Sequence, residues 1–181
     1  MARLTQLTFV RLTIVVTTNI LTTSSMSKGI QAEIKQTKPF KSLEEEVSVA
    51  LLRTADQLAW RGTEMLKRHG LSPTQYNALR ILRGAAEKGL ACTEIGERMI
   101  NRDPDITRLI DRLEPRGLVI RSREQKDRRV ITTRITTAGL ELLRSLDRPV
   151  TEFHQELLSP VGERQLRSLL RLLEAVRRRT E

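Results

Sequence analysis

The most constraining feature of the sequence is a pair of short helix patterns separated by three residues. "CTEIGERMI" predicts a first helix with Thr93 as its N-cap, and the break "NRD" follows it. "DPDITRLIDRLEPRG" predicts a second helix over residues 104–116, with Asp103 as N-cap and Pro104 in the first position. Gly117 lies just past its end, where a residue in the left-handed conformation often terminates a helix. Two helices joined by so short a break are typical of a helix-turn-helix.

Two strand patterns with a charged stretch between them come next in the chain. "LVIRSR" and "VITTRIT" are rich in β-branched residues and predict the strands of a hairpin. In "EQKDRRV" (residues 124–130), five of the six residues from Glu124 to Arg129 are charged, which predicts an exposed tip. A hairpin directly after a helix-turn-helix indicates a winged helix-turn-helix. The fold class is therefore mainly α with a small β-hairpin wing (α+β).

Helix signals outside this region divide the rest of the chain. "SLEE", "LSPTQ" and Thr136 each predict a helix start, and a helix after Ser159 is expected to follow one that is bent or broken near Pro149. The predicted segments are a disordered extension (1–41), an N-terminal dimerisation helix (42–70), the winged helix-turn-helix (71–136) and C-terminal dimerisation helices (137–181).

The extension has two interpretations. Residues 1–32 contain no acidic residue and include a short uncharged run, as a secretory signal does. That run is rich in threonine, so a true translation start at Met26 or an unstructured extension is favoured over export.

The flanking helices carry more apolar surface than one small winged domain can cover. Exposed on a monomer, this surface would promote aggregation, so a homodimer is expected. Its members are Val47, Leu51, Leu58, Leu166, Leu169, Leu170, Leu172 and Leu173.

Charge indicates the partner. The formal net charge is +10, and residues 101–134 hold ten Lys or Arg against six Asp or Glu, which points to double-stranded DNA. Aromatic residues make up only 3%, too few for rows that stack single-stranded bases. A single cysteine, Cys92, excludes an internal disulfide and indicates a reducing cytoplasm.

Other classes of function find no support in the sequence. The apolar run near the N-terminus is too short to span a bilayer, so no membrane partner is expected. No nucleophile–base pair, metal-spaced cluster or glycine-rich phosphate loop is present, so neither an enzyme nor a cofactor or metal is expected.

The second helix presents polar residues opposite an apolar face. At 100° per residue, its apolar residues cluster on one side and are expected to face the core: Ile106, Leu109, Ile110 and Leu113. Thr107, Arg108 and Arg112 fall on the other side. Arg108 suits guanine O6 and N7 in the major groove, while Thr107 and the helix N-terminus suit a phosphate. An ordinary solvated face would also be charged, but the helix-turn-helix context favours DNA reading.

The hairpin tip is expected to lie over the neighbouring minor groove, whose negative potential attracts arginine. The basic candidates are Lys126, Arg128 and Arg129. Asp127 is expected to orient one of these guanidinium groups rather than to touch DNA, because phosphate would repel it. The alternative is a merely solvated turn.

"LSPTQYNALRIL", "ITRLIDRLEPRGLV", "DRRV" and "ITTAG", in this order, resemble the MarR family of winged-helix repressors over residues 43–178. The resemblance implies an obligate homodimer on a pseudo-palindromic operator, with DNA contacts from Thr107, Arg108, Arg112 and Arg129. Pro104 and Asp105, which are also predicted to belong to the DNA-binding site, occupy the start of the reading helix, where many members carry Ser or Thr. An architectural DNA-binding protein of low sequence specificity is the alternative function.

The resemblance also implies a small phenolic or other lipophilic effector in a cleft beside the winged domain. Trp60, Met65, His69 and Tyr76 lie on segments expected to border this cleft, with ordinary core packing as the alternative. Some relatives sense oxidants through a cysteine near the start of the first helix. Cys92 departs from that arrangement and is expected to be inert.

Overall fold

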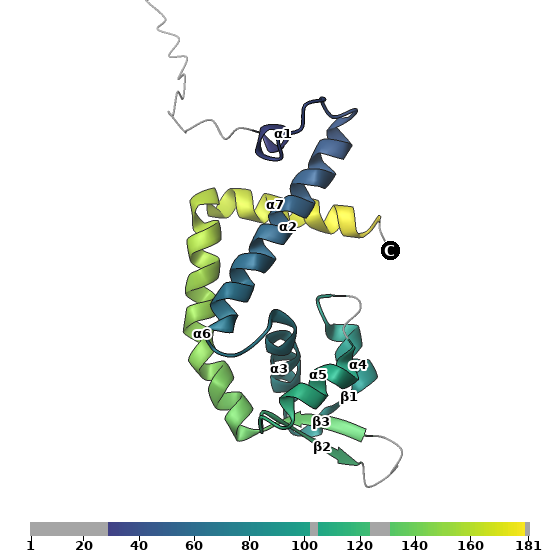
Figure 1. Cartoon of the computed structure of the whole chain (residues 1–181), viewed down its shortest axis with the longest axis vertical. Coiled ribbons are helices and arrows are strands. Elements are labelled where there is room, and N and C mark those ends of the chain that lie inside the picture. The colour runs from purple at the N-terminus through teal and green to yellow at the C-terminus, as the bar shows by residue number, and fades with distance from the viewer. Residues whose placement is uncertain (1–28, 102–104, 124–130, 180–181) are drawn as a thin grey trace, which may run out of the picture. The chain divides into compact units, whose positions relative to one another are not determined.

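The computed structural model describes residues 29–101, 105–123 and 131–179, and Figure 1 shows its elements. The mainly helical fold with a small antiparallel sheet confirms the predicted fold class. In chain order the elements are α1 (Ile30–Glu33), α2 (Leu43–Lys67), α3 (Pro73–Ala85), the 3-10 turn η1 (Ala86–Lys88), β1 (Leu90–Ala91), α4 (Cys92–Arg98), α5 (Ile106–Leu113), β2 (Val119–Arg123), β3 (Ile131–Ile135), α6 (Thr137–Leu158), the 3-10 turn η2 (Ser159–Val161) and α7 (Glu163–Arg177).

The chain divides into two compact units after Leu52, and the described part of the first unit covers residues 29–52. The single helical turn α1 lies in the extension that was predicted to be disordered, so part of that segment is helical. The predicted start of α2 is confirmed, because the Ser42 hydroxyl accepts a hydrogen bond from the N–H of Glu45 at 3.2 Å. The Glu45 carboxylate reaches one residue further back than expected and accepts the N–H of Lys41 at 2.7 Å.

The second unit, residues 53–181, contains the core. Helix α3 begins with the predicted capping box: Ser72 accepts the N–H of Gln75 at 3.2 Å, and the Gln75 side chain accepts the N–H of Ser72 at 3.0 Å. Helices α3, α4 and α5 and the first half of α6 pack around one apolar cluster. Its fully buried members include Leu79, Leu82, Ile95, Ile110, Leu113, Leu143 and Leu146.

The predicted start of α4 is wrong in its detail. Thr93 lies inside the helix, and the N-cap residue is Ala91, which has no side chain able to cap. Glu94 compensates, since its carboxylate accepts the N–H of Ala91 at 2.8 Å. A carboxylate in the first turn is also favoured by the helix dipole.

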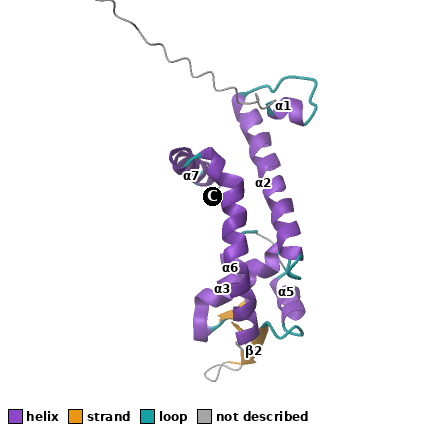
Figure 2. Cartoon of the chain, turned by 90° about the vertical axis from the view of Figure 1, so that its left-hand side faces the viewer, coloured by secondary structure: helices purple, strands orange, loops and turns teal. Residues whose placement is uncertain are grey.

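The predicted hairpin is confirmed and belongs to a three-stranded antiparallel sheet of order β1-β3-β2. Val119 pairs with Ile135 and Arg121 with Thr133, while the short strand β1, which was not predicted, pairs through Leu90 with Thr133. Figure 2 shows the sheet in orange beside α3 and α5. The hairpin is thus attached directly to the helical core.

Helix α6 begins as predicted, with Thr136 accepting the N–H of Gly139 at 3.1 Å. It then runs through Pro149 to Leu158, so the predicted break at the proline is wrong, while the alternative of a bend there stays a prediction. The prediction of Ser159 as the cap of the last helix is also wrong. Ser159 and the following proline form η2, and α7 starts after Gly162, whose φ of 84° suits glycine. Within the described ranges, no helix is both long and apolar enough to cross a bilayer.

Candidate nucleic-acid interface

Helix α5 is the predicted reading helix, and it is shorter than expected. Its N-cap is Asp105 instead of Asp103, because the Asp105 carboxylate accepts the N–H of Arg108 at 3.0 Å. An aspartate makes this bond as well as any residue, and its charge suits a helix N-terminus. A carboxylate already bonded there competes with phosphate for the same amides. The predicted phosphate contact at this terminus is therefore weakened.

Helix α5 ends at Leu113, three residues before the predicted end at residue 116, and a turn that contains the predicted Gly117 follows it. The N–H of Leu118 bonds the carbonyl of Leu113 at 3.3 Å, and Gly117 adopts a φ of 66°. This is the Schellman arrangement, which requires a residue that tolerates positive φ. The chain is thereby turned from α5 directly into β2.

The two faces of α5 are as the helical wheel predicted. The apolar residues Ile106, Leu109, Ile110 and Leu113 are buried, with exposures of 9% or less. Thr107, Arg108 and Arg112 are exposed. These three predicted DNA contacts therefore share the solvent side of α5.

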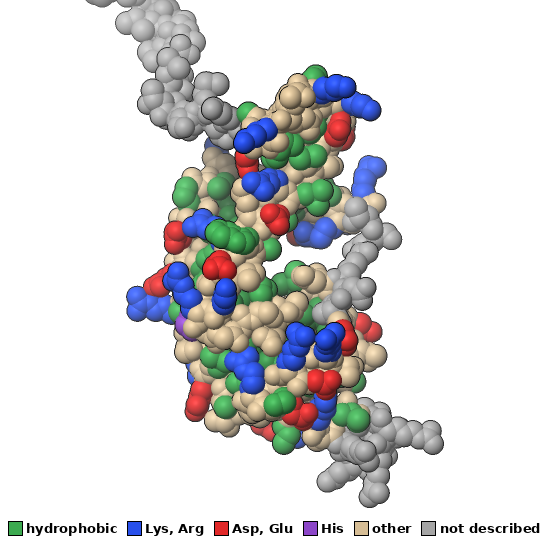
Figure 3. Space-filling view, viewed as in Figure 1, with side chains coloured by type: hydrophobic (Ala, Val, Ile, Leu, Met, Phe, Trp, Pro, Cys, Tyr) green, Lys and Arg blue, Asp and Glu red, His purple; other side chains and the backbone are tan. Residues whose placement is uncertain are grey.

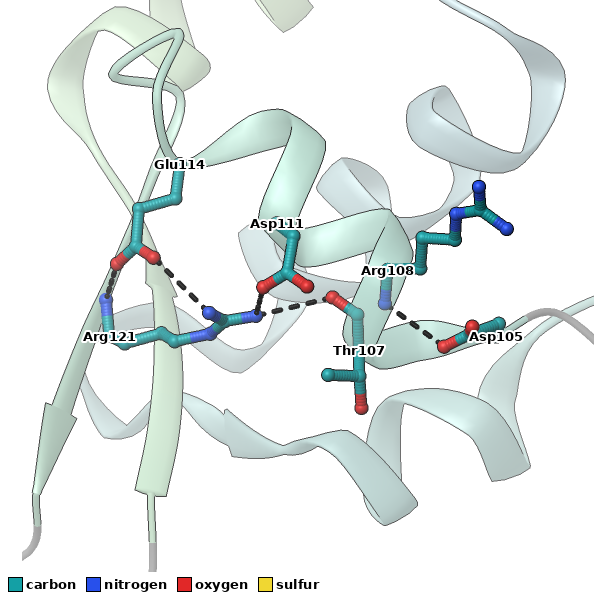
Figure 4. A network of polar contacts seen from close by, with 6 residues as sticks. All are labelled: Asp105, Thr107, Arg108, Asp111, Glu114 and Arg121. Carbon is teal, nitrogen blue, oxygen red and sulfur yellow. Dashed lines mark hydrogen bonds and ion pairs between the residues drawn. The ribbon is translucent and has the colours of Figure 1, made fainter.

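Figure 4 shows that one arginine of the wing forms hydrogen bonds to this solvent side. The Arg121 guanidinium on β2 donates to the Asp111 carboxylate at 2.6 Å, to the Thr107 carbonyl at 3.2 Å and to the Glu114 carboxylate at 3.3 Å. The backbone N–H of Arg121 also donates to Glu114 at 3.0 Å. Sequence reasoning had not singled out this residue.

The network divides the exposed side of α5 into two stripes. Thr107 and Asp111, one turn apart, lie on the stripe next to β2. Arg108 and Arg112 form the other stripe and, with Thr74 at the start of α3, line a shallow hollow. Among the described residues, no acidic side chain forms an ion pair with either of these two arginines. Figure 3 shows basic and acidic side chains close together over α5.

Several residues of the predicted DNA-binding site lie outside the described residues. These are Pro104, Lys126, Asp127, Arg128 and Arg129. The described parts of β2 and β3 lead up to the predicted tip, since Arg123 pairs with Ile131 at their last rung. The role of the tip stays a prediction.

A cavity of about 270 Å³ lies between α2, α3, α6 and the end of α4, and all the residues that line it belong to the second unit. Its walls include the predicted Met65 and Tyr76, but neither Trp60 nor His69. Trp60 is 66% exposed and borders a separate depression with Arg61. Sequence reasoning missed most of the walls, which include Leu58, Ala59, Gly62, Asn77, Arg80, Met99, Val150, Phe153 and His154.

Tyr76 lies in the cavity wall and is half-buried. Burial raises the pKa of its phenol above the ordinary value of 10.0, and the nearby Arg80 and Arg83 oppose part of that rise. The Arg80 guanidinium lies 5.7 Å from the ring centroid, in a cation–π contact. The Asn77 amide and the Met99 sulfur are 3.5 Å apart, which joins the cavity to the end of α4.

Comparison with known proteins agrees with this geometry. The MarR family matches residues 71–131. The crystal structure of a MarR transcription factor from Planctomyces limnophilus is 42% identical, with a TM-score of 0.59 over 76% of this chain and 99% of that chain. The HTH-type transcriptional regulator MhqR of Bacillus subtilis (strain 168) is 29% identical over 61% of this chain and 75% of MhqR. The S. aureus MepR–DNA complex shares the fold, at 20% identity and a TM-score of 0.65 over 71% of this chain and 94% of MepR. The chain belongs to the MarR family of transcriptional regulators.

Proposed function

We propose that two copies of this chain bind a pseudo-palindromic operator through α5 in the major groove and the wing in the minor groove, and that a small lipophilic effector controls this binding. The observation that carries the proposal is the solvent side of α5. It combines a hydroxyl and two guanidinium groups on a helix whose other face is anchored in the core. Such a helix suits major-groove reading. The protein is then a regulator that acts in the cytoplasm and not an enzyme.

Pairing of two copies is supported by the uncovered faces of two helices. No residue of α7 is buried, and its apolar residues Leu170 and Leu172 are 60% and 64% exposed. On α2, Leu43 and Leu52 are 71% and 72% exposed. Exposed apolar stripes of this size favour association. A two-fold dimer would hold its two reading helices about one DNA turn apart, or a multiple of that distance.

Arg108→Ala tests the reading helix. We expect its operator affinity to fall by about 1–3 kcal/mol while affinity for a scrambled duplex changes little, because a base contact carries specificity. The operator would be a duplex footprinted upstream of the chain's own gene. Arg144→Ala on α6, an exposed site, removes the same charge elsewhere and should spare the ratio of the two affinities. A wild-type ratio near one would instead indicate an architectural DNA-binding protein.

The cavity supports the effector part of the proposal. Its volume of about 270 Å³ is just below the range of ligand pockets, roughly 300–1,000 Å³, and its walls are mostly apolar with a few polar groups. This composition suits a small aromatic or aliphatic molecule with one polar end. The end of α4 forms part of the wall, so an occupant would contact the segment that leads to α5.

Filling the cavity tests this part separately. A Cβ on Gly62 would lie 3.9 Å from the Phe153 ring, so Gly62→Leu should occupy the space without disturbing the backbone. Gly84→Leu on α3, where a Cβ meets nothing within 4 Å, adds the same side chain outside it. With phenol, benzoate and decanoate as probes, we expect operator release from the wild type and Gly84→Leu but not from Gly62→Leu. Equal release from all three proteins would contradict a ligand in this cavity.

A further inference from the structure

We infer that Arg121 is a positioning residue that locks α5 to the wing strand, so that operator discrimination depends on a side chain placed away from the bases. The inference rests on the proposed function. It concerns how the reading helix is held, whereas the proposed function concerns what that helix reads.

The contacts of Arg121 span most of α5. Its guanidinium bonds the Thr107 carbonyl in the first turn, Asp111 in the last turn and Glu114 at the C-cap. The side chain is only 26% exposed, while Asp111 is 53% and Glu114 37% exposed. A planar guanidinium with five donors can satisfy three such acceptors at once, whereas a lysine ammonium acts as a single point charge. The site therefore specifies arginine and not merely a positive charge.

Helix α5 needs such a brace because its own structure does not fix its orientation. At eight residues it is too short to be stable alone. Its apolar face is held by burial, but hydrophobic contacts are non-directional and permit small rotations about the helix axis. Hydrogen bonds from β2 to the opposite flank restrict that rotation. A small rotation would displace the long Arg108 side chain from a base edge.

The same contacts neutralise unfavourable charge. Asp111 and Glu114 lie in the C-terminal part of α5, where the helix dipole disfavours acids and where approaching phosphates would repel them. Pairing with Arg121 offsets both carboxylates. Arg108 and Arg112, on the other stripe, then remain available for DNA.

The experiment compares Arg121→Met with Arg134→Met, which removes the same charge from an exposed position on the neighbouring strand β3. Operator and scrambled duplexes are titrated by fluorescence anisotropy at one salt concentration, with circular dichroism to confirm folding. We expect Arg121→Met to lower the operator-to-scrambled affinity ratio by about tenfold or more, the value of one lost base contact. Arg134→Met should weaken both duplexes alike and leave the ratio unchanged.

Two further variants separate positioning from charge. Arg121→Lys keeps the charge but should recover only a minority of the lost ratio. Asp111→Asn should lower the ratio by itself and, combined with Arg121→Met, add little more than about twofold, because the bond to Asp111 is already lost with Arg121. If Arg121→Met does not fold, Asp111→Asn alone carries the test.

Three results would overturn the inference. The first is an equal loss on both duplexes from Arg121→Met, as expected for Arg134→Met. The second is full recovery of the ratio by Arg121→Lys. The third is an unchanged ratio in Asp111→Asn. A wild-type ratio near one is a different result, because it would overturn the proposed function itself.

Discussion

Adjacent threonines on β3 offer a sharp test of the core behind the reading helix. Thr133 is fully buried, and among the described residues its hydroxyl has no hydrogen-bond partner. Thr132 is 4% exposed, and its hydroxyl oxygen lies 3.2 Å from the Ser122 hydroxyl and 3.3 Å from the Ser122 carbonyl. The same Thr→Val substitution therefore removes an unpaired hydroxyl at one position and a paired one at the next.

The expected effects have opposite signs. A buried polar group without a partner costs roughly 1–3 kcal/mol, so Thr133→Val should raise the free energy of unfolding by about 1–2 kcal/mol. Replacing hydroxyl by methyl keeps the shape, so no cavity opens. Thr132→Val loses a satisfied hydrogen bond and should lower the free energy of unfolding by about 1 kcal/mol. For a chain of this size, 1 kcal/mol corresponds to about 2–4 °C in Tm.

Urea unfolding at one fixed protein concentration is the appropriate assay, because a dimer's apparent stability depends on concentration. The midpoints of the two variants should move in opposite directions while the slope m stays constant. A destabilised Thr133→Val, matching Thr132→Val, would mean that the Thr133 hydroxyl does form a hydrogen bond in solution. The conclusion that this hydroxyl has no hydrogen-bond partner would then be refuted.

Two other predictions concern packing and ionisation. Gly139→Ala should lower the free energy of unfolding by roughly 2 kcal/mol or more. The added Cβ would lie 2.7 Å from a side-chain carbon of Ile135 and closer still to the Leu118 carbonyl oxygen. An unchanged urea midpoint would contradict this prediction. Tyr76, the only tyrosine, should ionise above pH 10.0 in tyrosinate absorbance titrations. Its raised folded-state pKa contributes stability that is present below that pH and is lost as the pH rises through the folded value. Arg80→Met should raise this pKa further, and a fall would contradict the assigned cause.

The sequence predicted best those features whose cause is local. Ser42, Ser72 and Thr136 each cap a helix through an amide three residues away, so the signal and the structure share one short segment. Strand β1 could not be predicted in this way. Leu90 and Ala91 are extended because β3 lies beside them, more than forty residues further along the chain.

The cavity shows the same limit for a binding site. Met65 and Tyr76 were expected to border the cleft and do line the cavity, but the sequence could not indicate which helix lies opposite them. Phe153 and Val150 come from α6, a segment far away in sequence. Trp60 was also expected to border the cleft, although its position on α2 directs it into solvent. Residue type alone therefore selects candidates, and packing decides among them.

Arg121 was missed although a signal for it exists in the sequence. Alternate residues of a strand share a face, so Arg121 lies on the same face as Val119, which is 2% exposed. Its cross-strand partner on β3 is the fully buried Thr133. An arginine on the inner face of a strand must find acceptors, because an unpaired buried charge is costly. The nearest acids that precede it are Asp111 and Glu114, on a helix that turns directly into this strand. Period-two alternation, applied to the charged residues as well as the apolar ones, therefore predicts the contact that holds the reading helix to the wing.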